Sequence, residues 1–417
     1  MTEKTNIPQG YKDSPLGIIP KEWEVKKLGD ICDYVDYRGK SPQKSSKGIF
    51  LITAKNIREG YIDYEVSQEF IPIDEFEEAM RRGKALIGDV LITTEAPLGH
   101  VAQIDKPNIA LAQRVIKYRA KSGLLNTYLK HFLMSEKFQT LLKANATGST
   151  ALGKKGSRLH QLPIILPCVD EQKQILLILN LWDTAIEKQS ELIEKLKLRK
   201  RALMQQFLTG KKRLPGFSGE WKRKKLGDIA ERVTRKNEED CKNVVTISAQ
   251  RGFVIQTDFF NKSVASETLD NYYLIHKDEF CYNKSYSNGY PMGAIKRLTA
   301  FDKAVVTTLY ICFKLKNLST INIDFFEQYC ESGIFNKELV KIANEGGRAH
   351  GLLNVTPTDF FNMQMKIPNL EEQNAIATVL VNADKEIELV NEKLASLQSQ
   401  KRGLMQQLLT GKKRVSI

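Results

Sequence analysis

The sequence lacks the residue patterns of an enzyme active site. Its 417 residues contain no HExxH, GxSxG or GxGxxG motif and no EF-hand loop. The five histidines, at positions 100, 131, 160, 276 and 350, are scattered, and none stands at metal-ligand spacing. We therefore expect no catalytic residues, no metal and no cofactor in this chain.

Paired cysteine motifs and long apolar runs are also missing. The six cysteines include no CxxC pair, which favours inert thiols in a reducing compartment. No apolar run reaches the roughly 18 residues of a membrane span. The first residues, MTEKTNIPQG, have no hydrophobic signal-peptide core. These absences predict a cytoplasmic protein without a membrane segment.

A phosphate-binding pattern occurs once, but it is incomplete. Residues 148–154, GSTALGK, fit GxxxxGK, yet Lys155 follows where a P-loop needs Ser or Thr for magnesium. A helical segment, not a strand, precedes the pattern, so we do not assign a nucleotide site. The mixture of Gly, hydroxyl and basic residues over 147–158 is typical of a surface that contacts phosphate oxygens, and equally of a solvated turn.

Positive charge is abundant. The chain has 63 Lys and Arg against 49 Asp and Glu, a formal net charge of +14. This balance favours an anionic partner, with nucleic acid ahead of a membrane surface.

A repeated segment organises the whole chain. Residues 201–213, RALMQQFLTGKKR, return at 402–414 as RGLMQQLLTGKKR, matching at 11 of 13 positions with an offset of 201. The start of each half is repeated too, as WEVKKLGDI from Trp23 and WKRKKLGDI from Trp221. We interpret both tryptophans as packed anchors at the domain starts. The chain therefore consists of two tandem halves with shared ends and divergent middles.

Each half ends in a long predicted helix. Apolar residues recur at steps of three and four for nearly five heptads, interrupted by Gln189, Lys200 and Lys401. Pro167 and Pro368 precede the helices, and a glycine follows each. The predicted seam residues are Ile175, Leu179, Trp182, Ile186, Ile193, Leu196, Leu203, Ile376, Leu380, Ile387, Leu394, Leu397 and Leu404.

The two stripes predict that the helices pair with each other. A helix of roughly 40 residues is about 60 Å long. If the first helix carries the chain away and the second brings it back, they pair as an antiparallel coiled coil with a pseudo-twofold axis. Such symmetry offers two near-equivalent docking sites.

The middles of the halves predict two α+β domains. Short β-type runs are expected at 49–53, 90–94, 115–118 and 164–166, with a helix near 124–144. The second half has matching runs at 244–248, 279–282 and 304–315, with a helix near 323–343. The expected division is a first domain over 1–168, a helix over 169–210, a second domain over 211–367, and a helix with a basic tail over 368–417.

This layout resembles the DNA-specificity (S) subunit of type I restriction-modification systems. The resemblance rests on IPKEW and GEW at the domain starts, KKLGDI after each, and GDVLITTEAPLGHV over 88–101. It also rests on LPCVDEQKQI and IPNLEEQNAI at the helix starts and LMQQ-(F/L)-LTGKKR at their ends. The second half departs from the pattern at 278–284, where DEFCYNK replaces GDVLITTE.

The resemblance implies a non-catalytic subunit that sets the DNA target of a larger enzyme. Each divergent domain would be a target recognition domain for one half of a bipartite site in double-stranded DNA. The paired helices would space the domains and bind two modification (methyltransferase) subunits, and restriction subunits would join the full complex. The alternative is a coiled-coil scaffold that joins two protein-binding domains without nucleic acid.

Candidate DNA contacts are polar and basic residues on loops after the expected strands. Arg pairs with guanine and Asn or Gln with adenine, whereas Lys mostly contacts phosphates. The candidates are Lys40, Ser41, Lys44, Lys55, Asn56, Arg58, Thr94, Glu95, Gln113, Arg114, Ser149, Thr150, Lys154, Lys155, Arg158, Arg235, Lys236, Gln250, Arg251, Asn283, Lys284, Ser287, Tyr290, Arg297, Arg348 and His350.

Overall fold

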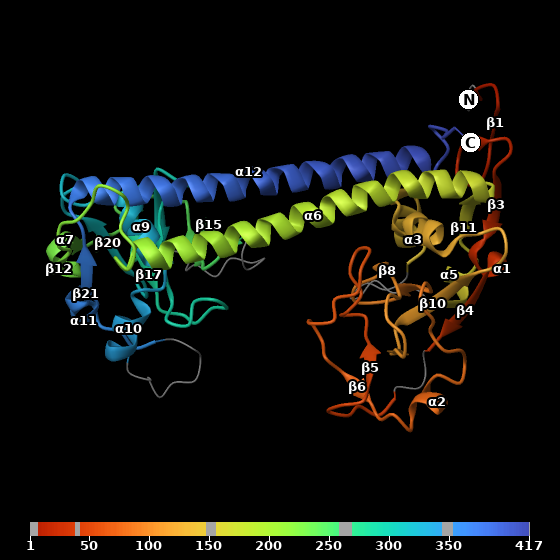
Figure 1. Ribbon diagram of the computed structural model, residues 1–417, viewed down its shortest axis with the longest axis horizontal. Coiled ribbons are helices and arrows are strands. Elements are labelled where there is room, and N and C mark those ends of the chain that lie inside the picture. Colours follow the sequence, from red (N-terminus) through yellow and green to blue (C-terminus); the bar gives the residue numbers. More distant parts are fainter. Residues whose placement is uncertain (1–6, 38–41, 147–155, 258–268, 344–352, 417) are drawn as a thin grey trace. The chain divides into compact units, whose positions relative to one another are not determined.

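The computed structural model describes residues 7–37, 42–146, 156–257, 269–343 and 353–416. The chain forms two compact units (Figure 1). Unit 1 contains Met1–Ser190 and Lys393–Ile417, and unit 2 contains Glu191–Glu392. The long helices α6 (Val169–Phe207) and α12 (Leu370–Leu408), of 39 residues each, contribute to both units.

The remaining elements of unit 1 precede α6. They are β1 (Tyr11–Lys12), β2 (Ile19–Pro20), β3 (Glu24–Lys27), α1 (Leu28–Ile31), β4 (Cys32–Asp36), β5 (Ile49–Ile52), β6 (Phe70–Ile71), α2 (Phe76–Ala79), β7 (Val90–Thr93), β8 (Val101–Gln103), β9 (Ala110–Leu111), β10 (Val115–Ala120), α3 (Asn126–Met134), α4 (Glu136–Ala144), α5 (Gly156–Leu159) and β11 (Pro163–Leu166).

The remaining elements of unit 2 lie between α6 and α12. They are β12 (Lys222–Lys225), α7 (Leu226–Ile229), β13 (Ala230–Arg232), β14 (Val245–Ser248), β15 (Gly252–Ile255), β16 (Tyr273–His276), β17 (Phe280–Asn283), β18 (Ala294–Arg297), β19 (Lys303–Val306), β20 (Ile311–Leu315), α9 (Ile323–Glu331), α10 (Asn336–Ile342), α11 (Pro357–Asn362) and β21 (Gln364–Ile367).

The two units share one sheet plan despite their divergent sequences. The four-stranded antiparallel sheet has the order β4-β10-β7-β8 in unit 1 and β13-β20-β17-β18 in unit 2. A two-stranded sheet closes each unit, β3 with β11 and β12 with β21. Smaller pairings are β6-β5-β9, β14-β15, β16-β19 and β1-β2. The predicted α+β class and the two-domain repeat are confirmed.

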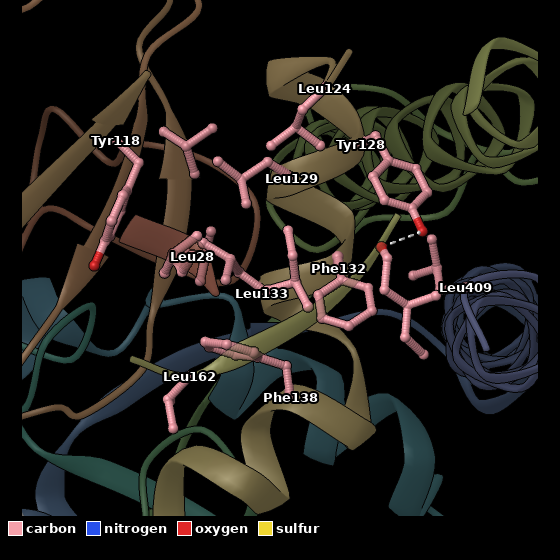
Figure 2. Close-up of a cluster of buried hydrophobic side chains, with 14 of the residues drawn as sticks. Leu28, Tyr118, Leu124, Tyr128, Leu129, Phe132, Leu133, Phe138, Leu162 and Leu409 are labelled. Atoms are coloured by element: carbon pink, nitrogen blue, oxygen red, sulfur yellow. Dashed lines mark hydrogen bonds between the residues drawn. The ribbon is translucent and has the colours of Figure 1, made fainter. Parts of the chain in front are cut away.

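Figure 2 shows how the core of unit 1 forms around α3. Leu129, Phe132 and Leu133 on α3 lie within this core cluster and are at most 1% exposed. Burying such a side chain stabilises a fold by about 1.5–3 kcal/mol. The hydroxyl of Tyr128, also on α3, donates to the backbone carbonyl of Ile165 at 3.2 Å, which fastens the helix to β11.

Three predicted elements are divided in the structure. The helix near 124–144 is two helices, because Ser135 leaves the helical conformation and its hydroxyl caps the second at the Phe138 N–H. The helix near 323–343 is likewise α9 and α10, separated by a turn with Gly333 at φ 73°. The run 304–315 contains two strands, β19 and β20, in different sheets.

The long helices pair within each unit. In unit 1, Ile175 and Leu179 near the start of α6 share a buried cluster with Met405 and Leu408 near the end of α12. In unit 2, the start of α12 shares a cluster with the end of α6 in the same way. In both units the first turns of one long helix pack against the last turns of the other, so the helices run antiparallel, as predicted.

The predicted seam residues differ in burial along these helices. Ile175, Leu179, Ile193, Leu196, Ile376 and Leu380 are at most 6% exposed. Trp182, Ile186, Leu203, Ile387, Leu394, Leu397 and Leu404 are half-buried.

The two lysines that interrupt the stripe pair with aspartates of the opposite helix. Lys200 on α6 donates to Asp384 on α12 at 2.5 Å. Lys401 on α12 forms the matching ion pair with Asp183 on α6. The positions are related by the repeat offset, since 183 and 200 correspond to 384 and 401. These ion pairs favour one register for the helices.

A helix from each domain also reaches these aspartates. Gln328 on α9 donates to Asp384 at 2.7 Å. His131 on α3 takes the same place in unit 1, but its Nε2 is 3.6 Å from Asp183, too far for a hydrogen bond. Burial, together with the positive charges of Lys130 and Lys401, holds the pKa of His131 well below its ordinary value.

This histidine predicts acid sensitivity in unit 1. Below about pH 6.5 the unfolded chain protonates His131 but the folded unit does not, so the free energy of unfolding falls by up to about 1.4 kcal/mol per pH unit. His131→Gln copies Gln328 and removes that loss. We expect urea unfolding between pH 7.5 and 5.5 to depend less on pH in the variant. His276→Gln, at a half-exposed position of unit 2, is the control. Equal pH dependence in all three proteins would contradict the assignment.

Candidate nucleic-acid interface

The repeated ends of the halves form the same cluster in each unit, a buried glutamate that accepts hydrogen bonds from a tryptophan and an arginine. We refer to this cluster as the lock. In unit 1 the Glu171 carboxylate, 1% exposed, accepts from Trp23 Nε1 at 2.7 Å and from Arg414 Nε at 2.6 Å. Trp23 is buried as an anchor, as predicted. In unit 2, Glu372 accepts from Trp221 Nε1 at 3.2 Å and from Arg213 Nε at 2.5 Å and Nη2 at 2.6 Å.

A glutamine joins each domain to its long helix. Gln172 Oε1 accepts from the Leu125 N–H at 2.9 Å, and its Nε2 donates to the Gly123 and Pro167 carbonyls. Gln373 makes the corresponding bonds to the Asn322 N–H and to two carbonyls. All these partners are backbone atoms, so the joint does not depend on which side chains the domain carries. Reasoning from the sequence did not assign roles to these residues, although each Glu-Gln pair belongs to the repeat.

Four predicted contacts of unit 1 converge at the end of β7 and the start of β10. The Thr94 N–H donates to the Arg114 carbonyl at 2.9 Å, and Glu95 lies 3.5 Å from the Arg114 guanidinium. Gln113 and Arg114 are exposed. The Thr94 hydroxyl is buried and has no hydrogen-bond partner among the described residues.

The backbone at this edge is strained. Ala96 and Arg114 have φ values of 37° and 73°, in the left-handed region that favours glycine. Strained residues and unpaired buried polar groups concentrate at functional sites. This edge, Thr94–Glu95 with Gln113–Arg114, is therefore the strongest candidate binding surface of unit 1.

The equivalent edge of unit 2 lies after β17. Gln250 Nε2 donates to the Asn288 carbonyl at 2.9 Å, which joins the β14–β15 turn to the loop after β17. Ser287 and Tyr290 exchange backbone hydrogen bonds in that loop. The Tyr290 hydroxyl donates to Glu331 at 2.7 Å, and burial and Glu331 raise its pKa. Gln250, Ser287 and Tyr290 are thus brought together.

Lys284 stands beside this loop and is half-buried. Burial, with a smaller effect of Arg232, lowers the pKa of its ammonium group. A nearby anion stabilises the charged form of such a lysine, so this position favours binding of an anion. Asn283 precedes Lys284 and accepts from the Ser285 N–H at 3.0 Å.

Several other candidates are already engaged within the protein. Asn56 is 0% exposed, and its amide bonds the Thr53 N–H and the Asp63 and Ser67 carbonyls. Its place is inside the 53–67 loop, not on a surface. Arg297 is held by Asp278, Asp324 and Glu327. The structure gives both residues an internal bonding role.

The remaining predicted DNA contacts are dispersed over the two units. Arg235 pairs with Glu279 at 2.6 Å, and Lys236 bonds the Asn271 carbonyl. Lys44 pairs with Glu69 at 2.6 Å, and Arg58 lies 3.5 Å from Asp63. Lys55, Arg158 and Arg251 are exposed. Lys40, Ser41, Ser149, Thr150, Lys154, Lys155, Arg348 and His350 lie outside the described residues.

The described part of the chain has neither a metal-ligand cluster nor a membrane-spanning helix. It contains no group of three His, Cys, Asp or Glu residues placed to hold a metal ion. Within the same residues, every helix is too short or too polar to cross a membrane.

Comparison with known proteins agrees with this architecture. The family model "Type I restriction modification DNA specificity domain" matches twice, over residues 20–198 and 218–399. The putative MjaX specificity subunit of a type I restriction enzyme from Methanocaldococcus jannaschii is 27% identical over 98% of this chain and 97% of its own. The MjaIX specificity subunit from the same organism is 32% identical, but the match covers only 45% of each chain.

Two solved structures share the fold. The crystal structure of a type I restriction-modification S subunit from M. genitalium has a TM-score of 0.50 and 16% identity, covering 98% of this chain and 99% of its own. A structure on complex assembly and conformational transition of the type I R-M system has a TM-score of 0.54 and 15% identity, covering 95% and 99%. With two matches that together span most of the chain, and the same duplicated fold, this protein belongs to the DNA-specificity subunits of type I restriction-modification systems, the subunits that determine the target sequence.

Proposed function

We propose that each unit reads one half of a bipartite site in double-stranded DNA. Unit 1 would read it through the edge of Thr94, Glu95, Gln113 and Arg114, and unit 2 through Gln250, Lys284 and the Ser287–Tyr290 turn. The observation that carries this proposal is the contrast between the two units. Their locks repeat residue for residue, whereas the edges after β7 and β17 carry different side chains.

The paired helices supply the partner surface in this proposal. They bind two modification (methyltransferase) subunits, and restriction subunits join the full complex. The antiparallel pairing supports two related docking surfaces, because each unit combines the start of one long helix with the end of the other.

The test is selection of bound duplexes from a randomised DNA pool by the full chain with its modification subunits. The selected duplexes are expected to contain two short specified blocks separated by an unread gap. Affinity should also fall steeply with salt, because phosphate contacts release counterions. A protein that enriches no sequence and binds no duplex would instead be a scaffold between two protein-binding domains.

A further inference from the structure

Unit 2 carries three exposed cations on one face of the sheet formed by β12 and β21. Strands β12 and β21 pair antiparallel, with Arg223 directly opposite Lys366 and Lys225 directly opposite Gln364. Opposite residues point to the same face, and so do residues two apart on one strand. Arg223, Lys225 and Lys366 are all exposed. We refer to these three residues as the basic strip.

Carboxylates lie beside the basic strip, but they are engaged with other groups: Glu338, for example, accepts from the Gln364 N–H at 3.4 Å and pairs with Lys341. No ion pair joins any of its three side chains to a described carboxylate. The nearby Glu372 is 1% exposed and already accepts from Arg213 and Trp221. The Asp228 carboxylate accepts from the Lys225 backbone N–H at 2.7 Å. Like charges directly opposite each other destabilise a sheet, so the Arg223–Lys366 pair favours binding of an anion.

The equivalent sheet of unit 1 forms without the opposed pair of charges. This sheet, β3 with β11, places Val25 opposite Ile165 at the matching positions. Ile165 is 0% exposed and Val25 packs against the core. Lys27, the counterpart of Lys225, is exposed in unit 1 as well. The pair of opposed charges, Arg223 and Lys366, is therefore what is specific to unit 2.

We propose that the basic strip binds the sugar-phosphate backbone of duplex DNA and adds affinity without adding sequence choice. This inference rests on the proposed DNA-reading function. The outward residues of this sheet are the basic strip and Gln364. None of these four has an apolar side chain that could anchor a protein partner, and protein interfaces depend on such anchors. Phosphate oxygens need only charge and hydrogen-bond donors, which Arg223, Lys225 and Lys366 supply.

The test compares charge removal at two places in unit 2. Arg223→Gln with Lys366→Gln should weaken binding equally on a selected and on a random-sequence duplex. The slope of log affinity against log salt should fall by about 2, near 0.9 per lost phosphate contact. The control, Lys195→Gln with Lys197→Gln, removes the same charge from α6, where the lysines pair with Glu191 and Glu194. Its slope should stay that of the parent.

A charge-preserving variant separates contact loss from misfolding. Arg223→Lys with Lys366→Arg should retain the parent slope. If the parent binds DNA and the slope is unchanged in the Gln variant, the proposed role of the basic strip is overturned while the proposed function stands. Loss of modification-subunit binding with an unchanged slope would assign the surface to a protein and also overturn it. A parent that binds no duplex would overturn the proposed function itself.

Discussion

Glu171→Ala is expected to destabilise unit 1 by about 3 kcal/mol. The substitution leaves Trp23 Nε1 buried without an acceptor and separates Arg414 from its buried partner. Removing one member of a buried pair costs several kcal/mol, because the other is left uncompensated. Urea unfolding with hydrogen exchange of the unit 1 amides measures the loss. Glu372→Ala should produce the same effect in unit 2, since the lock is repeated there.

Glu22→Gln is the matched control for this prediction. Glu22 also contacts Arg414, at 3.1 Å, but its side chain is 67% exposed. Exposed ion pairs are screened by solvent and contribute little to stability. If Glu171→Ala unfolds at the same urea concentration as Glu22→Gln, the buried lock does not hold the unit together.

Exchange of the first domain is expected to change one half of the DNA site and leave the other intact. The segment 32–168 begins at β4 and ends just before α6, so its replacement from a relative retains Trp23, Glu171 and Arg414. Gln172 bonds only backbone atoms of the replaced segment, so the joint survives the exchange. Specific DNA binding exceeds non-specific binding by about 10³-fold or more.

Competition binding measures this exchange. The parent should prefer its own site over the hybrid site by about 10³-fold, and the exchanged chain should reverse that preference. The mirror exchange of 230–367 is the control and should alter only the other half-site. A change in both half-sites after either exchange would show that the units do not act separately.

The repeat and the helix ends could be predicted because they depend on local signals. Pro167 and Pro368 mark the starts and Gly210 and Gly411 follow the ends, both glycines with φ near 70°. The breaks at Ser135 and Gly333 were not predicted, because one capping hydroxyl or one left-handed glycine interrupts a pattern that otherwise continues.

The binding edges could be predicted only in part. Thr94 and Arg114 are 20 residues apart in sequence, yet they share a backbone hydrogen bond, and the strain of Ala96 and Arg114 appears only in three dimensions. Asn56 and Arg297 have the residue types of base-reading side chains. Asn56 donates to the carbonyls of Asp63 and Ser67, and Arg297 pairs with Asp278 and Glu327. These partners come together only on folding, so they cannot be inferred from residue type. A polar residue after a strand therefore predicts a surface less reliably than repeated scaffold residues predict a joint.

We propose that the two units specify two separate DNA half-sites. The most direct test is the map of methylated sequences in cells that carry the parent or the 32–168 exchange together with the modification subunits. We expect two specified blocks around an unread gap in both maps, with only one block changed by the exchange. A single continuous block, or a change in both blocks, would contradict it.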